Sequence, residues 1–98
     1  MRIDFDWDPA KAASNVSTHG VAFGQAMTVF RDPLARSILD DTSGEERWVT
    51  IGETATGNLL VVVHTWTELS PDQAYVRIIS ARRPTANEAR QYREDPIP

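Results

Sequence analysis

The C-terminal part of the chain is the most constrained, because a proline separates a strand pattern from a helix start. Residues 74–82 alternate and are rich in β-branched side chains, which is typical of a half-buried strand. Pro84 has no N–H group for a β-ladder, so the strand must end before it. Thr85 and Glu88 have the three-residue spacing of a capping box, which predicts a helix over residues 86–94.

Half of the basic residues lie on this predicted strand–helix corner. Five of the ten Lys and Arg residues fall there: Arg77, Arg82, Arg83, Arg90 and Arg93. The chain as a whole has a net charge of −4, and nine of its ten basic residues are arginines, whose planar group binds phosphate and carboxylate in a bidentate manner. A G+C-rich genome would explain the preference for arginine but not the clustering. The corner is therefore predicted to bind a phosphate or an acidic partner.

Length and composition predict one domain over residues 1–98. Hydrophobic residues make up 41% of the chain, which is enough for a core. The absence of cysteine excludes disulfides, thiolate zinc sites and cysteine nucleophiles. No signal peptide is recognisable, and the longest apolar run, residues 59–63, is too short to span a bilayer. We therefore expect a cytoplasmic protein without membrane contact, and the net charge argues against nucleic-acid binding through a broad basic surface.

Hydrophobic periodicity predicts an α+β fold. The expected order is one strand (2–7), two helices (9–18 and 21–30), four strands (34–39, 47–54, 59–67 and 74–82) and a final helix (86–94), with a tail over 95–98. Short turns join the four later strands, which predicts an antiparallel four-stranded meander with helices packed on it. The most apolar strand, 59–67, is expected at the centre of the sheet, and 34–39 at an edge.

One side of the first predicted helix carries three polar side chains. Asp8 favours the start of this helix, and Gly20 favours its end. Lys11, Asn15 and His19 are four residues apart, so they lie on the same side. One interpretation of this spacing is that the three residues belong to a functional site. The other is that Asn15 and His19 only satisfy backbone carbonyl groups at the helix end.

Three segments of the chain resemble one known family. They are W-D-P-A-K-A-x-x-N-x-x-x-H-G-V-x-F at residues 7–23, E-R-W-x-x-I-G followed by L-L-V-V-V from residue 46, and R-I-I-S-A-R-x-x-x-x-x-E-x-x-x-Y at residues 77–92. Together they are similar to the BrnT toxins of bacterial type II toxin–antitoxin modules, over nearly the whole chain. The family commonly has a lysine directly before the His-Gly pair, where this chain has Thr18.

The resemblance implies a RelE-like α+β fold and a ribonuclease activity that inhibits translation. It also implies RNA as the substrate, a cytoplasmic setting and a BrnA-type antitoxin as the protein partner that neutralises the toxin. The complex would repress its own operon, so that operator DNA is contacted only indirectly, through the antitoxin. No cofactor is implied.

Metal-independent RNA cleavage needs proton transfer and a cation that stabilises the phosphorane charge. His19, which lies in the family motif, is the candidate for proton transfer. Arg77 and Arg82, followed by Arg47, are the candidates for stabilising the phosphate. His64 is expected to be structural, because its neighbours along the strand are apolar. No spacing typical of metal ligands occurs, so no metal site is predicted.

The predicted substrate-binding residues are Lys11, Asn15, Arg83 and Tyr92. Arg77 and Arg82 are five positions apart, so a regular strand points them to opposite faces, with Arg83 on the side of Arg77. One of the first two would then be structural and pair with Glu88 or an N-terminal aspartate. A bulge near Ser80 would instead bring them to the same face.

Two further interpretations stay open beside the ribonuclease toxin. One is a catalytically degenerate protein-binding module that acts as a co-repressor with the antitoxin, which Thr18 and the acidic charge favour. The other is a toxin whose target is not RNA.

Tyr92 either acts on the substrate or packs between helix and sheet. The antitoxin is expected on an exposed apolar groove or on the arginine corner itself.

Overall fold

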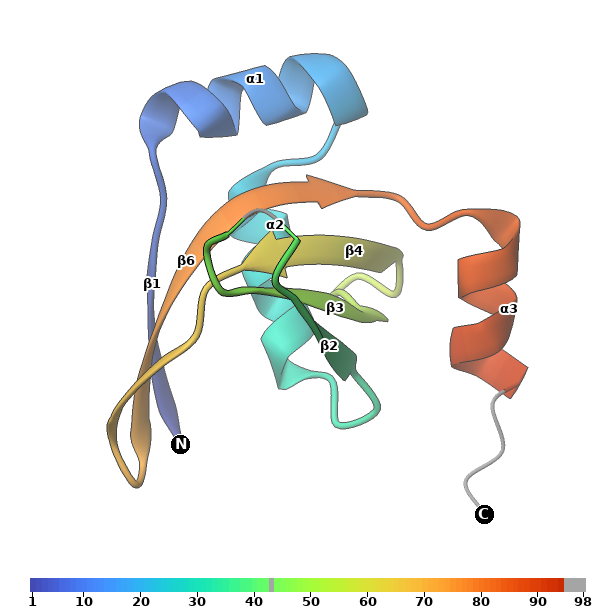
Figure 1. The fold of residues 1–98 in the computed structure, drawn as a ribbon. Coiled ribbons are helices and arrows are strands. Elements are labelled where there is room, and N and C mark those ends of the chain that lie inside the picture. Colours follow the sequence, from blue (N-terminus) through green and yellow to red (C-terminus); the bar gives the residue numbers. More distant parts are fainter. Residues whose placement is uncertain (43, 95–98) are drawn as a thin grey trace.

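The computed structural model describes residues 1–42 and 44–94. The elements, drawn in Figure 1, are β1 (Arg2–Asp6), α1 (Pro9–His19), α2 (Phe23–Ala26), the 3₁₀-helix η1 (Met27–Arg31), β2 (Arg36–Asp40), β3 (Arg47–Glu53), β4 (Leu59–His64), β5 (Thr67–Ser70), β6 (Gln73–Arg82) and α3 (Ala86–Glu94). The α+β class is confirmed. The predicted tail over 95–98 lies outside the described residues.

The strands form one six-stranded sheet in the order β1-β6-β4-β3-β2, with β5 also paired to β6. The apolar strand β4 lies at the centre and β2 at an edge, which confirms both predictions. β2, β3, β4, β5 and β6 pair in antiparallel fashion, whereas β1 is parallel to β6. The antiparallel meander predicted for the four later strands is confirmed by β2, β3, β4 and β6. The partner of β1 was not predicted, because hairpin lengths predict only the pairing of consecutive strands.

The predicted second helix and the predicted strand over 59–67 are both interrupted. The segment after Gly20 has only one α-helical turn before it tightens into η1, since Ala22 provides no side-chain cap and β-branched residues follow. The strand ends at His64, and β5 was not predicted. At this break the Thr65 hydroxyl accepts a hydrogen bond from the Arg77 N–H at 3.0 Å, so a side chain bonds the backbone where the ladder stops.

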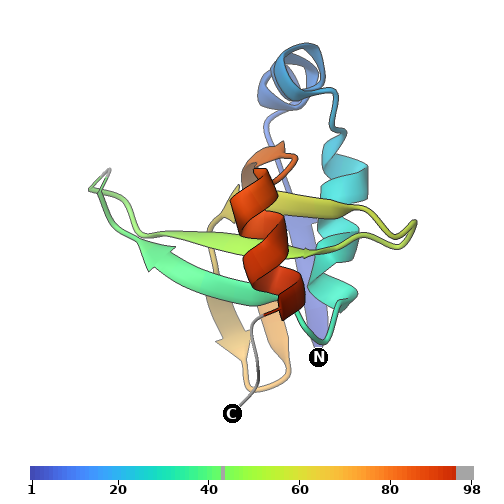
Figure 2. The same cartoon turned by 90° about the vertical axis from the view of Figure 1, so that its right-hand side faces the viewer.

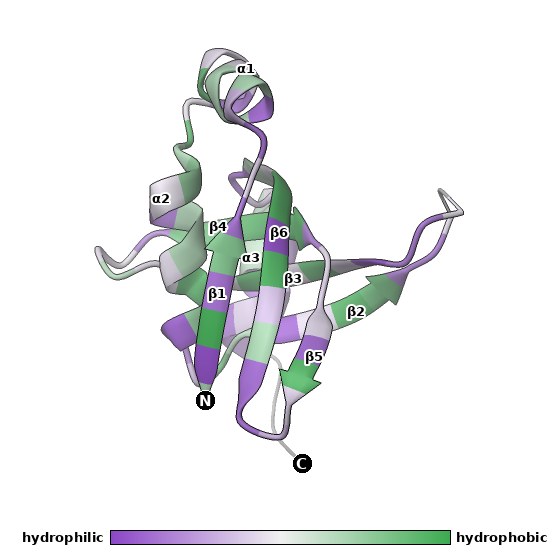
Figure 3. Ribbon diagram, turned by 90° about the vertical axis from the view of Figure 1, so that its left-hand side faces the viewer, coloured by the Kyte–Doolittle hydropathy of each residue, from purple (hydrophilic) through white to green (hydrophobic). Residues whose placement is uncertain are grey.

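The main core lies between the sheet and the segment formed by α1, α2 and η1. Its fully buried residues include Phe23, Val29, Leu60, Val76 and Ile78. Hydrophobic and hydrophilic residues alternate along β1, whose apolar side chains pack against this core (Figure 3). The predicted caps of α1 are present, because the Asp8 carboxylate accepts from the Ala10 N–H and Gly20 has a φ of 69°.

His64 is buried in this core and is structural, as predicted. Its Nδ1 donates to the Thr65 carbonyl at 2.8 Å, and its Nε2 lies 2.6 Å from the Thr50 hydroxyl. A carbonyl only accepts, so Nδ1 carries the proton and Nε2 of the neutral ring accepts from Thr50. Burial lowers the pKa of His64, which favours this neutral form.

The opposite face of the sheet, called the open face below, carries Val49, Ile51 and Val61 together with alternate residues of β6. Helix α3 runs across the strands on this side (Figure 2). None of its residues is buried. The groove between α3 and β2, β3 and β4 has a volume of about 550 Å³.

Candidate functional site

A bulge in β6 brings the two principal arginines to the same face of the sheet. His64 pairs with Ile78 and Val63 pairs with Ser80, so that Ile79 has no partner on β4. Buried positions consequently shift from Val76 and Ile78 to Ala81, three residues later. Arg77 lies next to Ile78 and Arg82 lies next to Ala81, so both arginine side chains point to the face opposite the core, which is the open face. The opposite-face arrangement expected for a regular strand does not occur, because the inserted residue reverses the alternation.

Arg77 and Arg47 converge on a single carboxylate. The Glu45 side chain accepts a hydrogen bond from Arg77 at 2.7 Å and forms an ion pair with Arg47 at 3.5 Å. The first arginine extends from β6 and the second from the start of β3, so two separate strands supply the cationic groups. Together they form a site for an oxyanion, which Glu45 provides here.

Arg47 has a further donor that no described group uses. Its Nε atom is buried and has no hydrogen-bond partner. A buried, unpaired donor costs about 1–3 kcal/mol. The side chain as a whole is 30% exposed, so an incoming anion can reach the guanidinium. An anion at the Arg47–Arg77 pair would therefore contact the outer guanidinium nitrogens of Arg47 rather than the buried Nε atom.

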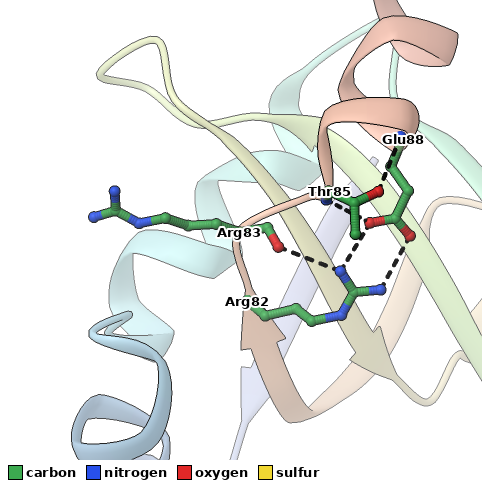
Figure 4. Close-up of polar contacts among 4 residues, drawn as sticks. All are labelled: Arg82, Arg83, Thr85 and Glu88. Atoms are coloured by element: carbon green, nitrogen blue, oxygen red, sulfur yellow. Dashed lines mark hydrogen bonds and ion pairs between the residues drawn. The ribbon is translucent and has the colours of Figure 1, made fainter.

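Arg82 has a different environment, because Glu88 binds it in a bidentate manner (Figure 4). The two bonds from the guanidinium nitrogens to the Glu88 carboxylate oxygens are 2.8 and 3.0 Å long. The hydrogen bond from Arg82 is the main cause that lowers the pKa of Glu88 to about 2. Glu88 also accepts from the Thr85 N–H, and Thr85 accepts from the Glu88 N–H, which confirms the predicted capping box. Arg82 thus fixes the start of α3 to the end of β6.

His19 lies at the C-terminal end of α1, beside the open face. It lines a shallow hollow of about 220 Å³ together with Lys11, Thr18 and the bulge residues Ile79 and Ser80. Ser80 lies between Arg77 and Arg82 in the sequence of β6, about 7 Å from the latter at the usual rise per residue. The structure therefore places His19 and Lys11 next to the middle of the arginine-bearing strand segment.

The Asn15 side chain is buried and held by hydrogen bonds rather than exposed at the surface. Its amide accepts from the Ala81 N–H at 3.1 Å and donates to the Ala81 carbonyl at 2.8 Å and to the Val21 carbonyl at 2.9 Å. The amide thereby pairs with β6 beyond the end of β1, as a neighbouring strand would. Asn15 is only 6% exposed. Its role is to hold α1, and with it His19, against the bulge.

Tyr92 and Arg83 also lie apart from the Arg47–Arg77 pair. The Tyr92 hydroxyl donates to the Asp32 carboxylate, and burial together with this bond raises the pKa of Tyr92 to about 12. Such a phenol is a poor acid at neutral pH and instead ties α3 to the end of η1. The Arg83 side chain points away from Arg82 (Figure 4), so the predicted sharing of a face with Arg77 is wrong, again because of the bulge.

Sequence reasoning missed three side chains that shape this region. They are Glu45, which occupies the arginine pair, Asp32, which receives Tyr92, and Ser80, which lines the His19 hollow. Glu45 and Arg77 are thirty-two positions apart, and no local pattern links them. Asp32 directly precedes Pro33, a position that indicates only the end of a helix.

The described residues contain neither a candidate metal-ion cluster nor a membrane-spanning helix. Within 1–42 and 44–94, no three His, Cys, Asp or Glu side chains lie together as they would around a metal ion. Over the same residues, no helix has the length and apolar character needed to cross a membrane.

Comparison with known proteins places this geometry in a family. No curated protein sequence matches the chain. The crystal structure of the Brucella abortus ribonuclease toxin BrnT matches with a TM-score of 0.60 and 18% identity, over 87% of this chain and 99% of that one, which shows a common fold. The model of the family described as the ribonuclease toxin BrnT of type II toxin–antitoxin systems matches residues 7–88. Because this match spans most of the 98 residues, the chain belongs to the BrnT family of ribonuclease toxins.

Proposed function

We propose that this toxin is a metal-independent endoribonuclease that acts on the open face beside the β6 bulge. The observation that carries the proposal is the convergence of Arg77 and Arg47 on the carboxylate of Glu45. A carboxylate and a phosphodiester present similar oxygen acceptors to a guanidinium. The substrate phosphate would displace Glu45 and take its place between the two arginines.

In the proposed reaction the ribose 2′-hydroxyl loses its proton to solvent water, its oxygen attacks the adjacent phosphorus, and the bond to the 5′-oxygen breaks. Arg77 and Arg47 stabilise the negative charge that grows on the non-bridging oxygens. His19 transfers its proton to the departing 5′-oxygen, since histidine is the side chain best suited to this transfer near neutral pH. The products are a 2′,3′-cyclic phosphate and a 5′-hydroxyl.

The supporting residues hold this arrangement rather than react. Asn15 positions α1 and Arg82 positions α3, as their hydrogen bonds indicate. Lys11 lies in the same hollow as His19 and would bind a neighbouring phosphate. The predicted substrate-binding role of Asn15 and the catalytic role of Arg82 are replaced in this proposal by positioning roles.

Membership of a type II toxin family implies an antitoxin, and we propose a BrnA-type protein that docks in the groove under α3. The groove has an apolar floor of Val49, Ile51 and Val61, and Ile38, which also lines it, is 68% exposed. Bound there, the antitoxin would cover the RNA path. Inhibition of translation in the cytoplasm would follow from RNA cleavage by the free toxin.

The test is cleavage of RNA by the purified chain in the presence of EDTA, beside His19→Ala and Arg77→Ala variants whose folding is checked by circular dichroism. We expect the wild-type chain to cleave RNA and to leave cyclic-phosphate ends. Each substitution should reduce the rate of cleavage at least a hundredfold. A folded wild-type protein that leaves RNA intact would refute the proposal. Retained binding to the antitoxin in that case would favour a co-repressor without activity, with Thr18 as the first residue to exchange for lysine.

A further inference from the structure

A second pair of arginines lines a cavity on the side of β6 away from Arg82. Arg83 and Arg93 border a space of about 220 Å³, and the side chains of Gln25 and Asn58 also line it. The remaining walls are Val21, Leu59, Leu60, Pro84 and Ala89. The Arg83 side chain points away from the Arg82–Glu88 pair (Figure 4).

The two guanidinium groups at this cavity have no counter-ion among the described residues. Neither Asp nor Glu contributes to the lining. Within residues 1–42 and 44–94, neither Arg83 nor Arg93 donates a side-chain hydrogen bond or forms an ion pair, whereas Arg77 and Arg82 are each bound to a carboxylate. Both arginines are exposed to solvent, so an anion that enters the cavity can reach them.

The cavity adjoins the hollow that contains His19. Val21 lines the cavity, and its carbonyl accepts the hydrogen bond from Asn15, which lines the hollow. Only Gly20 separates Val21 from His19 in the chain. A strand of nucleic acid bound across Arg77 and His19 can therefore continue past the end of α1 toward Arg83.

We infer that the Arg83–Arg93 cavity binds a backbone phosphate of the RNA strand, outside the bond that is cleaved. The inference rests on the proposed ribonuclease function and extends its substrate path. Two guanidinium groups provide paired donors for the phosphate oxygens, and Gln25 in the lining has an amide that can provide a further donor. Such a contact positions the strand without reading its sequence.

The experiment measures binding of a 2′-O-methyl RNA 12-mer, which lacks the nucleophile, by fluorescence anisotropy over a range of salt concentrations. One phosphate contact to single-stranded RNA contributes about 0.7 to the slope of log K against log salt. The Arg83→Gln/Arg93→Gln variant is expected to lose that amount, which makes binding about fivefold weaker at 0.1 M salt. Arg31→Gln, at the exposed end of η1, removes one positive charge elsewhere and should leave the slope unchanged.

A cleavable RNA of the same sequence gives the second readout. The double glutamine variant is expected to raise KM and to keep kcat at saturating RNA, because the cavity lies outside the reacting bond. The double lysine variant retains both charges and should retain the salt slope. Loss of slope in the lysine variant, or an unchanged slope in the glutamine variant, would overturn the inference.

The outcomes separate this inference from the proposed function. A wild-type protein that binds the 12-mer with the expected dependence on Arg83 and Arg93 but cleaves no RNA would refute the ribonuclease proposal and support the phosphate site. A wild-type protein that cleaves RNA, but whose RNA binding does not depend on Arg83 and Arg93, would support the ribonuclease proposal and refute the phosphate site. Preferential binding of poly-glutamate through the two arginines would assign the cavity to an acidic protein partner and overturn the inference.

Discussion

Replacement of Asn15 by alanine should be among the most destabilising single changes on α1. The substitution removes one acceptor and two donors, and it leaves the Ala81 N–H, the Ala81 carbonyl and the Val21 carbonyl without partners. Ala81 and Val21 are almost fully buried. At about 1 kcal/mol or more for each unsatisfied buried group, the free energy of unfolding should fall by about 3 kcal/mol.

The assay is equilibrium unfolding in urea, followed by circular dichroism, with thermal unfolding as a second measurement. A loss of that size lowers Tm by more than about 10 °C in a domain of this length. Ser14→Ala is the matched control, because Ser14 is the exposed neighbour on the same helix and should change stability by less than about 0.5 kcal/mol. A loss below about 1 kcal/mol for Asn15→Ala would refute the reasoning.

Asn15→Asp distinguishes hydrogen bonding from the filling of space. The aspartate has nearly the volume of asparagine and keeps the acceptor for the Ala81 N–H, but it cannot donate to the two carbonyl groups. An ionised carboxylate would also face both carbonyl oxygens at close range. We therefore expect Asn15→Asp to be at least as destabilising as Asn15→Ala at pH 7. Near-normal stability would show that packing, rather than the hydrogen bonds, holds α1.

Three further substitutions test other contacts. Glu45→Gln should strengthen RNA binding severalfold, measured as a lower KM, because the charged competitor for the arginine pair is removed. Glu88→Gln should cost less than about 1 kcal/mol after screening by solvent. Since the pKa of Glu88 is about 2, the Arg82 bond stabilises the fold above the ordinary glutamate pKa and is lost as pH falls toward 2, so the variant and wild type should converge there in urea titrations. Gly52→Ala would place a methyl carbon 2.6 Å from a Val29 carbon. The free energy of unfolding, measured by the same urea titration, should therefore fall by about 1–3 kcal/mol.

The local features of the fold could be predicted from the sequence because neighbouring residues determine them. The capping box at Thr85 depends on residues three positions apart, and the caps of α1 depend on Asp8 and Gly20 in the same way. The central place of β4 follows from its continuous apolar run, since a strand that is buried on both faces needs no polar alternation.

The parts that were missed depend on contacts between distant segments. β1 pairs with β6 across some seventy positions, with Ile3 opposite Ala74, and nothing in the alternation of residues 2–7 specifies a parallel partner. The bulge at Ile79 is a one-residue offset between two strands, which neither strand reveals alone. Because that offset sets the direction of every later side chain, the sequence could nominate Arg77, Arg82 and Arg83 but could not sort them by face.

The Asn15 bond to Ala81 also links stability to the proposed chemistry. It lies one residue beyond Ser80, so the same amide that completes the sheet edge holds the His19 end of α1 beside the arginine-bearing face. In Asn15→Ala, assayed at a temperature where the variant is folded, kcat for RNA cleavage should fall at least tenfold because a loosened α1 no longer fixes the proton donor. KM should change less than kcat, since Lys11 is the one proposed phosphate contact on α1 and the Arg47–Arg77 pair is on other elements. An unchanged kcat in the folded variant would mean that the position of α1 does not limit the reaction.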